Sequence, residues 1–139
     1  MSRLKNFLPL PTIINKNLGK LLTIEDDLPL RETLVDILEL SGHTVVQAGD
    51  GEEGVEIFSK TAPDLVLCDI NMPKMDGFAV LEKIKKLVGA GELPPFIFLS
   101  AKTEQKNIKY GLSLGAVDFV SKPYSAPELL KLIDLRLKR

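Results

Sequence analysis

Acidic side chains follow two apolar runs of this chain, at the point where each run ends. Asp69 comes directly after Leu65–Cys68, a short hydrophobic run typical of a strand that is buried on both faces. The acidic residues 25–27 come directly after a second run, Lys20–Ile24. If the two runs are neighbouring parallel strands, their acids converge at the carboxyl edge of the sheet. Crowded carboxylates repel unless a cation neutralises them, and such hard oxygen ligands suit Mg²⁺ or Mn²⁺.

These acids also have simpler interpretations. An aspartate can merely end a strand, and acidic residues are common at helix N-termini, where they accept hydrogen bonds from free backbone amides. Within the 25–27 cluster, Asp27 is the residue that we expect to act only as a helix cap. The cluster and Asp69 together therefore indicate a site more strongly than either does alone.

Two further strand ends carry a hydroxyl and an ammonium group. The apolar run Pro95–Leu99 is followed by Ser100, and the run Ala116–Val120 is followed by Ser121 and Lys122. A serine hydroxyl and a lysine point charge both suit phosphate oxygens. Each is ordinary on its own. Four predicted strands thus end, in chain order, with two acids, with an Asp, with a Ser and with Lys-Pro. This order indicates one site that handles phosphate.

With these strand ends in place, the sequence resembles the receiver domains of bacterial two-component response regulators. The resemblance extends over residues 20–139 and leaves residues 1–19 as an irregular N-terminal extension. It implies an α/β fold of the flavodoxin-like kind, a doubly wound parallel sheet of five strands in the order 2-1-3-4-5 with five helices. The segments that carry it are Leu21–Asp27, Asp69–Gly77, Phe98–Ala101 and Leu114–Pro123.

The resemblance implies a metal site at the acidic positions. Asp26 and Asp69 would bind Mg²⁺ (or Mn²⁺) directly, and the backbone carbonyl of Asn71 would be a further ligand. Glu25 would act through a water molecule, and it stands where most members of the family carry Asp.

The resemblance also implies that Asp69 is the phosphoacceptor. Ser100 and Lys122 would hold the phosphoryl group, and Phe119 would be an aromatic switch that works with Ser100. Ser100 and Phe119 stand where Thr and Tyr are more frequent, and Val117 lies where an acid is usual. None of these departures removes a functional group that phosphorylation requires.

A receiver domain would be a signalling protein and not a conventional enzyme, limited to self-catalysed phosphoryl transfer to Asp69 and autodephosphorylation. Its expected partner is a histidine kinase or a histidine phosphotransfer protein. Phosphorylation would alter the surface of the helix 104–114, the strand 116–120 and the helix that begins near Pro127. Leu135 falls opposite the apolar face of this last helix, so we expect a homodimer or output-domain contact there. The Lys122–Pro123 peptide is expected to be cis by resemblance alone.

Other functions fit the residues less well. A phosphotransferase of the haloacid dehalogenase type needs a second acid two residues after the nucleophile, where this chain has Asn71. A phosphorylation-independent interaction module of the same fold remains the alternative, and intact Asp69, Ser100 and Lys122 argue against it. Nucleotide binding is disfavoured because neither glycine-rich phosphate-binding motif occurs, and a flavin protein would need a phosphate loop that is missing.

The composition is that of one globular domain. The chain has 139 residues and a net charge of −1, which gives no electrostatic case for nucleic-acid binding. Cys68 is the single cysteine, so we expect a buried core thiol and a cytoplasmic location. His43 lacks Cys or His neighbours in the sequence and is expected at the surface. No membrane-spanning segment is predicted. In the N-terminal extension, we expect Phe7, Leu8 and Leu10 to pack on the domain.

Overall fold

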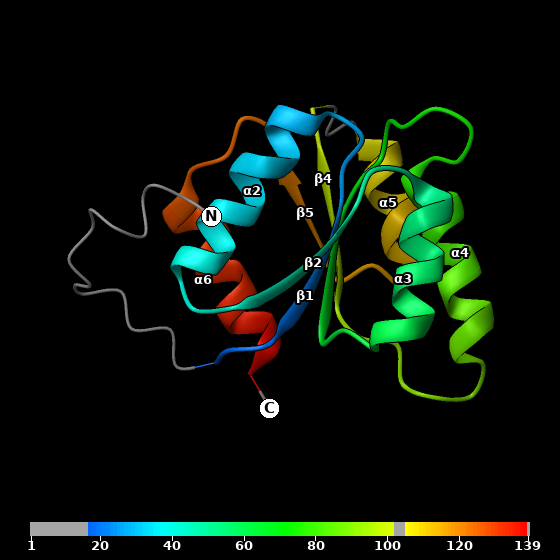
Figure 1. Cartoon of the computed structure of the whole chain (residues 1–139). Helices are drawn as coiled ribbons and strands as arrows, with labels where there is room; N and C mark the ends of the chain where they lie inside the picture. Colours follow the sequence, from blue (N-terminus) through cyan, green and yellow to red (C-terminus); the bar gives the residue numbers. More distant parts are fainter. Residues whose placement is uncertain (1–16, 102–104, 139) are drawn as a thin grey trace.

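A computed structural model describes residues 17–101 and 105–138 of the chain (Figure 1). Five parallel strands form one sheet in the order β2-β1-β3-β4-β5, which confirms the predicted fold class. The strand order reverses between β1 and β3, so their carboxyl ends lie side by side at a switch point. The strands are β1 (Lys20–Ile24), β2 (Thr44–Ala48), β3 (Leu65–Asp69), β4 (Phe96–Ser100) and β5 (Asp118–Ser121).

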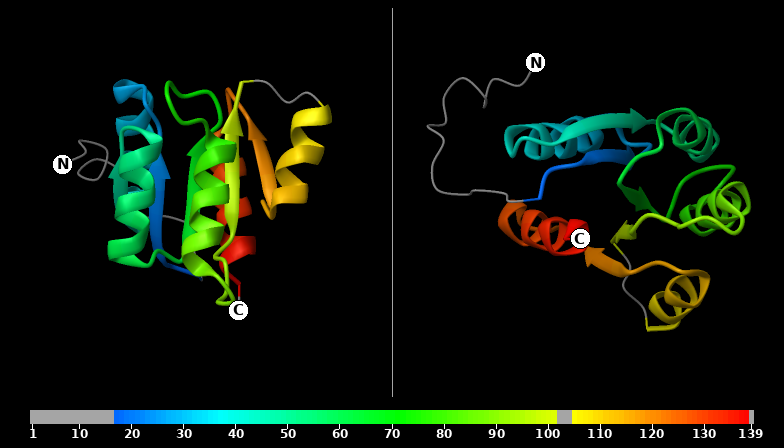
Figure 2. Two further views of the ribbon diagram at one scale, coloured as in Figure 1. Left: turned by 90° about the vertical axis from the view of Figure 1, so that its right-hand side faces the viewer. Right: turned by 90° about the horizontal axis from the view of Figure 1, so that it is seen from below.

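Helices cover both faces of the sheet. Figures 1 and 2 show helices on either side of the sheet. The first face carries α2 (Leu28–Leu40) and α6 (Ala126–Leu137). The second face carries α3 (Gly51–Thr61), α4 (Gly77–Val88) and α5 (Gln105–Leu114).

The central strand β3 is buried on both faces, as its continuous apolar run predicts. Leu65 and Leu67 pack in one core cluster with residues of α2 and α6, and Val66 and Cys68 pack in the other cluster with residues of α3 and α4. Successive side chains of a strand point to opposite faces, so both layers need apolar residues here. Cys68 has no accessible surface, which confirms its predicted core position.

Side-chain caps fix where four of the helices begin. The side chain of Asp27 accepts a hydrogen bond from the backbone N–H of Leu30 at 3.1 Å, so its predicted capping role is confirmed. A cap of this kind satisfies an amide that has no partner within the helix. The N-caps are Asp27, Asp50, Asp76 and Ser125.

His43 is buried, so its predicted surface position is wrong. Its residue is 4% exposed, and its Nδ1 accepts a hydrogen bond from the backbone N–H of Gly19 at 3.2 Å. Lys20 pairs with Thr44 in the β1–β2 ladder, so the residues just before these strands are brought together. This contact joins positions that are far apart in the sequence, and no local pattern around His43 indicates it.

Some details differ from the expected element bounds or fall outside the described residues. β5 begins at Asp118, after a turn in which Gly115 has a φ of 115° and Ala116 N–H bonds to the carbonyl of Gly111. The expected packing of Phe7, Leu8 and Leu10 lies outside the described residues. Within the described segments, no helix is long and apolar enough to span a bilayer.

Candidate functional site

Acidic side chains from β1 and β3 meet at the carboxyl edge of the sheet. Ile24 pairs with Cys68 in the ladder, so the residues that follow them lie next to each other. Glu25, Asp26 and Asp69 each offer a carboxylate oxygen, and these oxygens all lie within 4.8 Å of one another. Glu25 and Asp69 are buried, whereas Asp26 is exposed. The structure thus brings together the three acids that the strand pattern predicted to converge.

Lys122 lies among these carboxylates. It follows β5, and its backbone N–H donates to the carbonyl of Ser100 at the end of β4. Its Nζ is 2.5 Å from Oε1 of Glu25 and 3.5 Å from Oδ1 of Asp69. The peptide that follows Lys122 is cis, as the resemblance predicted. One ammonium group therefore faces both buried acids.

Burial governs the ionisation of this cluster. Burial raises the pKa of Glu25, the hydrogen bond from Lys122 opposes the rise, and the charge of Asp69 adds to it. Burial also raises the pKa of Asp69, against the attraction of Lys122. Burial disfavours the charged form of Lys122, but its hydrogen bond to Glu25 and the two nearby carboxylates outweigh that effect and raise its pKa. Keeping Glu25 and Asp69 ionised in the folded protein therefore costs electrostatic free energy.

The acidic cluster fits a hard divalent cation. The cluster has three carboxylates, and Lys122 forms ion pairs with two of them, so negative charge is in surplus. Mg²⁺ and Mn²⁺ prefer oxygen ligands, and the three carboxylate oxygens lie close enough together to share one ion. A bound cation would relieve the repulsion between Asp69 and its acidic neighbours.

Ser100 lies on the strand next to Asp69. Asp69 pairs with Leu99 in the β3–β4 ladder, and Ser100 is the next residue of β4. Ser100 is 1% exposed. Asp69, Ser100 and Lys122 thus come from three neighbouring strand ends, in the order that the sequence predicted.

The loop after Asp69 folds back beside the site. Asn71 lies on this loop and is exposed. The backbone N–H of Gly77 donates to the carbonyl of Ile70 at 2.9 Å, which closes the loop. A Cβ on Gly77 would collide with the backbone carbonyl of Asp69, so only glycine fits this close approach. The turn that the sequence indicated thereby holds the backbone of Asn71 near Asp69.

Phe119 is half-buried between β5 and α5. Its ring packs against Phe98 with a centroid distance of 5.1 Å, and Phe98 in turn contacts Phe78 of α4 at 5.1 Å. A Cβ on Gly111 would lie 2.5 Å from Cζ of Phe119. The ring thus occupies space that the glycine of α5 leaves open, a contact for which the sequence carries no local signal.

Arg31 is a residue of the site that the sequence analysis missed. It lies on α2, and its Nη1 donates to the backbone carbonyl of Glu25 at 2.8 Å. Its Nε donates to Oε1 of Gln47 on β2 at 3.2 Å. An arginine in the first turns of an amphipathic helix is ordinary, and only the fold shows what it contacts.

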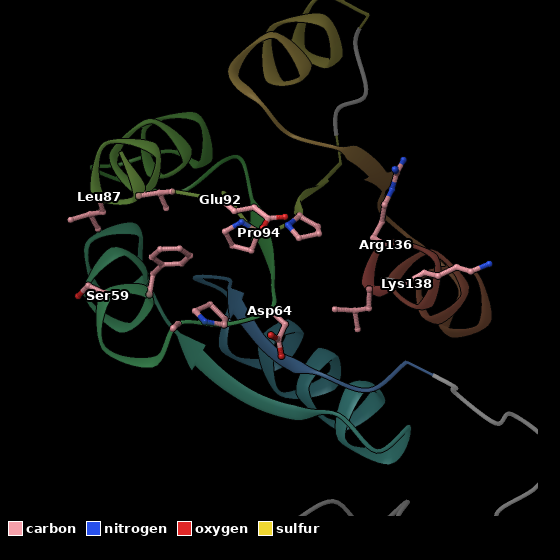
Figure 3. Close-up of a pocket in the computed structure, with 13 residues that line it drawn as sticks. Ser59, Asp64, Leu87, Glu92, Pro94, Arg136 and Lys138 are labelled. Carbon is pink, nitrogen blue, oxygen red and sulfur yellow. The ribbon is translucent and has the colours of Figure 1, made fainter. Parts of the chain in front are cut away.

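A separate pocket of about 880 Å³ opens at the opposite edge of the sheet (Figure 3). It is lined by residues that precede β3 and β4, such as Asp64 and Pro94, and by the end of α6. None of the acids at the carboxyl edge lines it. The chemistry predicted from the sequence therefore does not belong to this pocket.

Comparison with known proteins identifies the family. The family model described as "Response regulator receiver domain" matches residues 21–134. Transcriptional regulatory protein DltR of Streptococcus agalactiae is 39% identical over 120 residues, which cover 86% of this chain and 52% of that protein. Transcriptional regulatory protein RprY of Bacteroides fragilis is 37% identical, covering 86% of this chain and 50% of that protein. The chain thus spans about half the length of these relatives.

Solved structures give the same assignment. The chemotaxis protein CheY4 of Vibrio cholerae superposes with a TM-score of 0.80 and 26% identity, covering 85% of this chain and 98% of that one. A chain of the CheX–CheY–BeF3–Mg complex of Borrelia burgdorferi superposes with a TM-score of 0.79 and 28% identity, covering 86% of this chain and 90% of that one. The motifs, the fold and these matches agree: the chain belongs to the response regulator receiver domain family.

Proposed function

We propose that Asp69 accepts a phosphoryl group, in a reaction that depends on Mg²⁺, from a histidine kinase or a histidine phosphotransfer protein. The observation that carries this proposal is the position of the Asp69 carboxylate. It lies 3.5 Å from Nζ of Lys122 and shares a cluster of close oxygens with Glu25 and Asp26. An acceptor in this position has the Lys122 ammonium group on one side and acidic residues that could hold a metal ion on the other. The receiver unit would comprise residues 20–139, with residues 1–19 as an extension.

In the proposed reaction, an oxygen of the Asp69 carboxylate attacks the phosphorus of a phosphohistidine. The phosphorus–nitrogen bond of the donor breaks, and its electron pair stays on the ring nitrogen. The donor imidazole, which is already protonated on its other nitrogen, leaves as a neutral ring, and Asp69 becomes an acyl phosphate. Lys122 places its ammonium against a phosphoryl oxygen, and the Ser100 hydroxyl donates to another. Later attack by water on the phosphorus returns Asp69 to its carboxylate and releases inorganic phosphate.

The residues that would hold the metal are Asp26, Asp69, the backbone carbonyl of Asn71 and, through water, Glu25. When bound, a divalent cation neutralises charge that gathers on the phosphoryl oxygens. The chain itself supplies the acids and keeps Glu25 and Asp69 buried, so their attraction for a cation is less screened than at an open surface.

The proposed output is a change in the surface formed by α5, β5 and α6. Phosphorylation adds a charge near −2 at pH 7. Ser100 would be drawn toward that charge, and Phe119 would turn further inward beneath α5, which shifts a two-state equilibrium. Leu135 of α6 is 59% exposed and would contribute to a homodimer or output-domain contact on this surface. Sedimentation of the wild type and of Leu135→Glu, each with and without beryllofluoride, tests the homodimer. A wild type that stays monomeric under all conditions rules the homodimer out.

A phosphorylation-independent interaction module would need neither a reactive acceptor nor a cation site. Incubation with acetyl phosphate, followed by intact-mass measurement, separates it from a receiver. We expect one added phosphoryl group in the wild type with Mg²⁺ and none with EDTA. Equal labelling of the wild type and Asp69→Asn would contradict the proposal, and no labelling of a folded, Mg²⁺-binding wild type would support the module.

A further inference from the structure

Arg31 connects three segments that surround the acidic cluster. From α2 it donates to the carbonyl of Glu25 through Nη1 and to the side chain of Gln47 through Nε. The guanidinium group presents its donors in a rigid planar fork, so two acceptors held at once fix its orientation. One side chain thereby ties the end of β1 to β2 and to the first turns of α2.

Gly49 leaves the space that this guanidinium occupies. A Cβ on Gly49 would lie 2.8 Å from Nη1 of Arg31, closer than side chains approach in proteins. The backbone amide of Gly49 donates to Oε1 of Glu53, a bond that an alanine would keep. Gly49 therefore serves the placement of Arg31, and its substitution would displace the guanidinium without removing the charge.

The backbone that carries the acids is held from both sides of Glu25. Its N–H donates to the carbonyl of Ala48 at 3.1 Å, and its C=O accepts from Arg31 at 2.8 Å. The carbonyl of Glu25 belongs to the peptide that leads directly into Asp26. Asp27 is fixed in turn because its side chain caps α2. Asp26 lies between these two anchors with an exposed side chain, so its position depends on the orientation of this peptide.

We propose that Arg31 is a positioning residue for divalent-cation binding, acting through the backbone of Glu25 and Asp26. The proposal rests on the metal site of the proposed function and goes beyond it, because Arg31 donates to a backbone carbonyl and to the side chain of Gln47, and not to a carboxylate. Partners that orient metal ligands in other proteins contribute 10–100-fold to metal affinity.

Position and charge predict opposite effects of removing Arg31. If the arginine acted only through its positive charge, its loss would strengthen cation binding, since like charges repel. If it orients the Glu25–Asp26 peptide, its loss weakens cation binding. Arg136 offers a matched control, because it also donates to a backbone carbonyl, that of Val117, and forms an ion pair with Asp118.

The test is a Mg²⁺ titration of the whole chain followed by amide chemical shifts in NMR spectra, with folding of each variant checked by thermal unfolding in EDTA. We expect Arg31→Ala and Gly49→Ala to weaken Mg²⁺ binding roughly tenfold. Arg31→Lys keeps the charge but not the fork, and should recover only part of the loss. Arg136→Ala should bind as the wild type does. The double variant Arg31→Ala/Gly49→Ala should be no weaker than Arg31→Ala alone, because both changes remove the same contact.

Two contrary outcomes are distinguishable. In the first, the wild type binds Mg²⁺, and Arg31→Ala and Gly49→Ala bind it as tightly or more tightly. That result would overturn the positioning role and leave the proposed function intact. A wild type that binds no Mg²⁺ would overturn the metal dependence of the proposed function, and the role of Arg31 with it. If Arg31→Ala does not fold, Gly49→Ala decides the question alone.

Discussion

The ammonium group of Lys122 is closer to Glu25 than to Asp69. Its Nζ lies 2.5 Å from Oε1 of Glu25, against 3.5 Å from Oδ1 of Asp69. The Glu25 side chain is 4% exposed, so the lysine is the cation that compensates a buried acid. Lys122 thus has a structural partner as well as a proposed catalytic one, and this double role makes its removal informative.

Lys122→Ala should separate phosphoryl transfer from metal binding. Phosphoryl uptake from acetyl phosphate should fall roughly 100-fold, the cost of removing one strong donor to a developing charge. Mg²⁺ affinity should stay the same or increase, because a competing cation has left the carboxylates. Lys60→Ala, which removes an exposed lysine, is the control. A parallel loss of Mg²⁺ affinity and phosphorylation in Lys122→Ala would show that the lysine mainly maintains the site.

Asp69→Asn should stabilise the protein at pH 7 in EDTA. Burial raises the pKa of Asp69, so the folded state holds this proton more tightly than the unfolded state. Stability from this group is complete below the unfolded pKa of about 3.8 and is lost as pH rises through the folded value. Asp69→Asn removes the ionisable carboxyl group and so avoids this loss of stability. Thermal unfolding should show a gain at pH 7 that disappears near pH 3, and a destabilised variant at pH 7 would contradict this.

His43 should make stability fall as the medium becomes mildly acidic. Burial lowers the pKa of His43 from 6.5, and its Nδ1 must stay unprotonated to accept from Gly19. The histidine's contribution is therefore complete above pH 6.5 and declines as pH falls from there toward the folded pKa. Chemical unfolding between pH 7.5 and 5 measures it. The difference in stability between wild type and His43→Gln should shrink over this interval, and a constant difference would refute the account.

Gly111→Ala should destabilise the fold because the new methyl group collides with the Phe119 ring. Overpacking of this kind costs about 1–3 kcal/mol, although alanine favours a helix by up to about 1 kcal/mol over glycine. A double-mutant cycle with Phe119→Ala, followed by urea unfolding, separates the two effects. In the Phe119→Ala background, Gly111→Ala should be neutral or stabilising. The same loss in both backgrounds would show that the ring is not the cause.

Much of this structure could be predicted from local sequence patterns. The apolar run before Asp69 predicts a strand buried on both faces, and polar residues at four strand ends predict where the site lies. These signals are local because a strand and its terminus are set by adjacent residues. Contacts between residues that are far apart in the sequence produce no local sequence pattern. Arg31 meets Glu25 only when α2 lies over β1, and His43 meets Gly19 only when β1 and β2 pair.

Locating the phosphoryl group in the chain tests the proposed acceptor role of Asp69 most directly. After treatment with acetyl phosphate and Mg²⁺, borohydride reduces an acyl phosphate to an alcohol, which converts the modified aspartate to homoserine. Trypsin then releases the peptide 61–74, which holds both Asp69 and Asp64. Asp64 accepts a hydrogen bond from the backbone of Lys20 at the other edge of the sheet, so it is an internal control. We expect homoserine at position 69 alone. Homoserine at 64 or 26, or in the absence of Mg²⁺, would show that Asp69 is not the Mg²⁺-dependent acceptor.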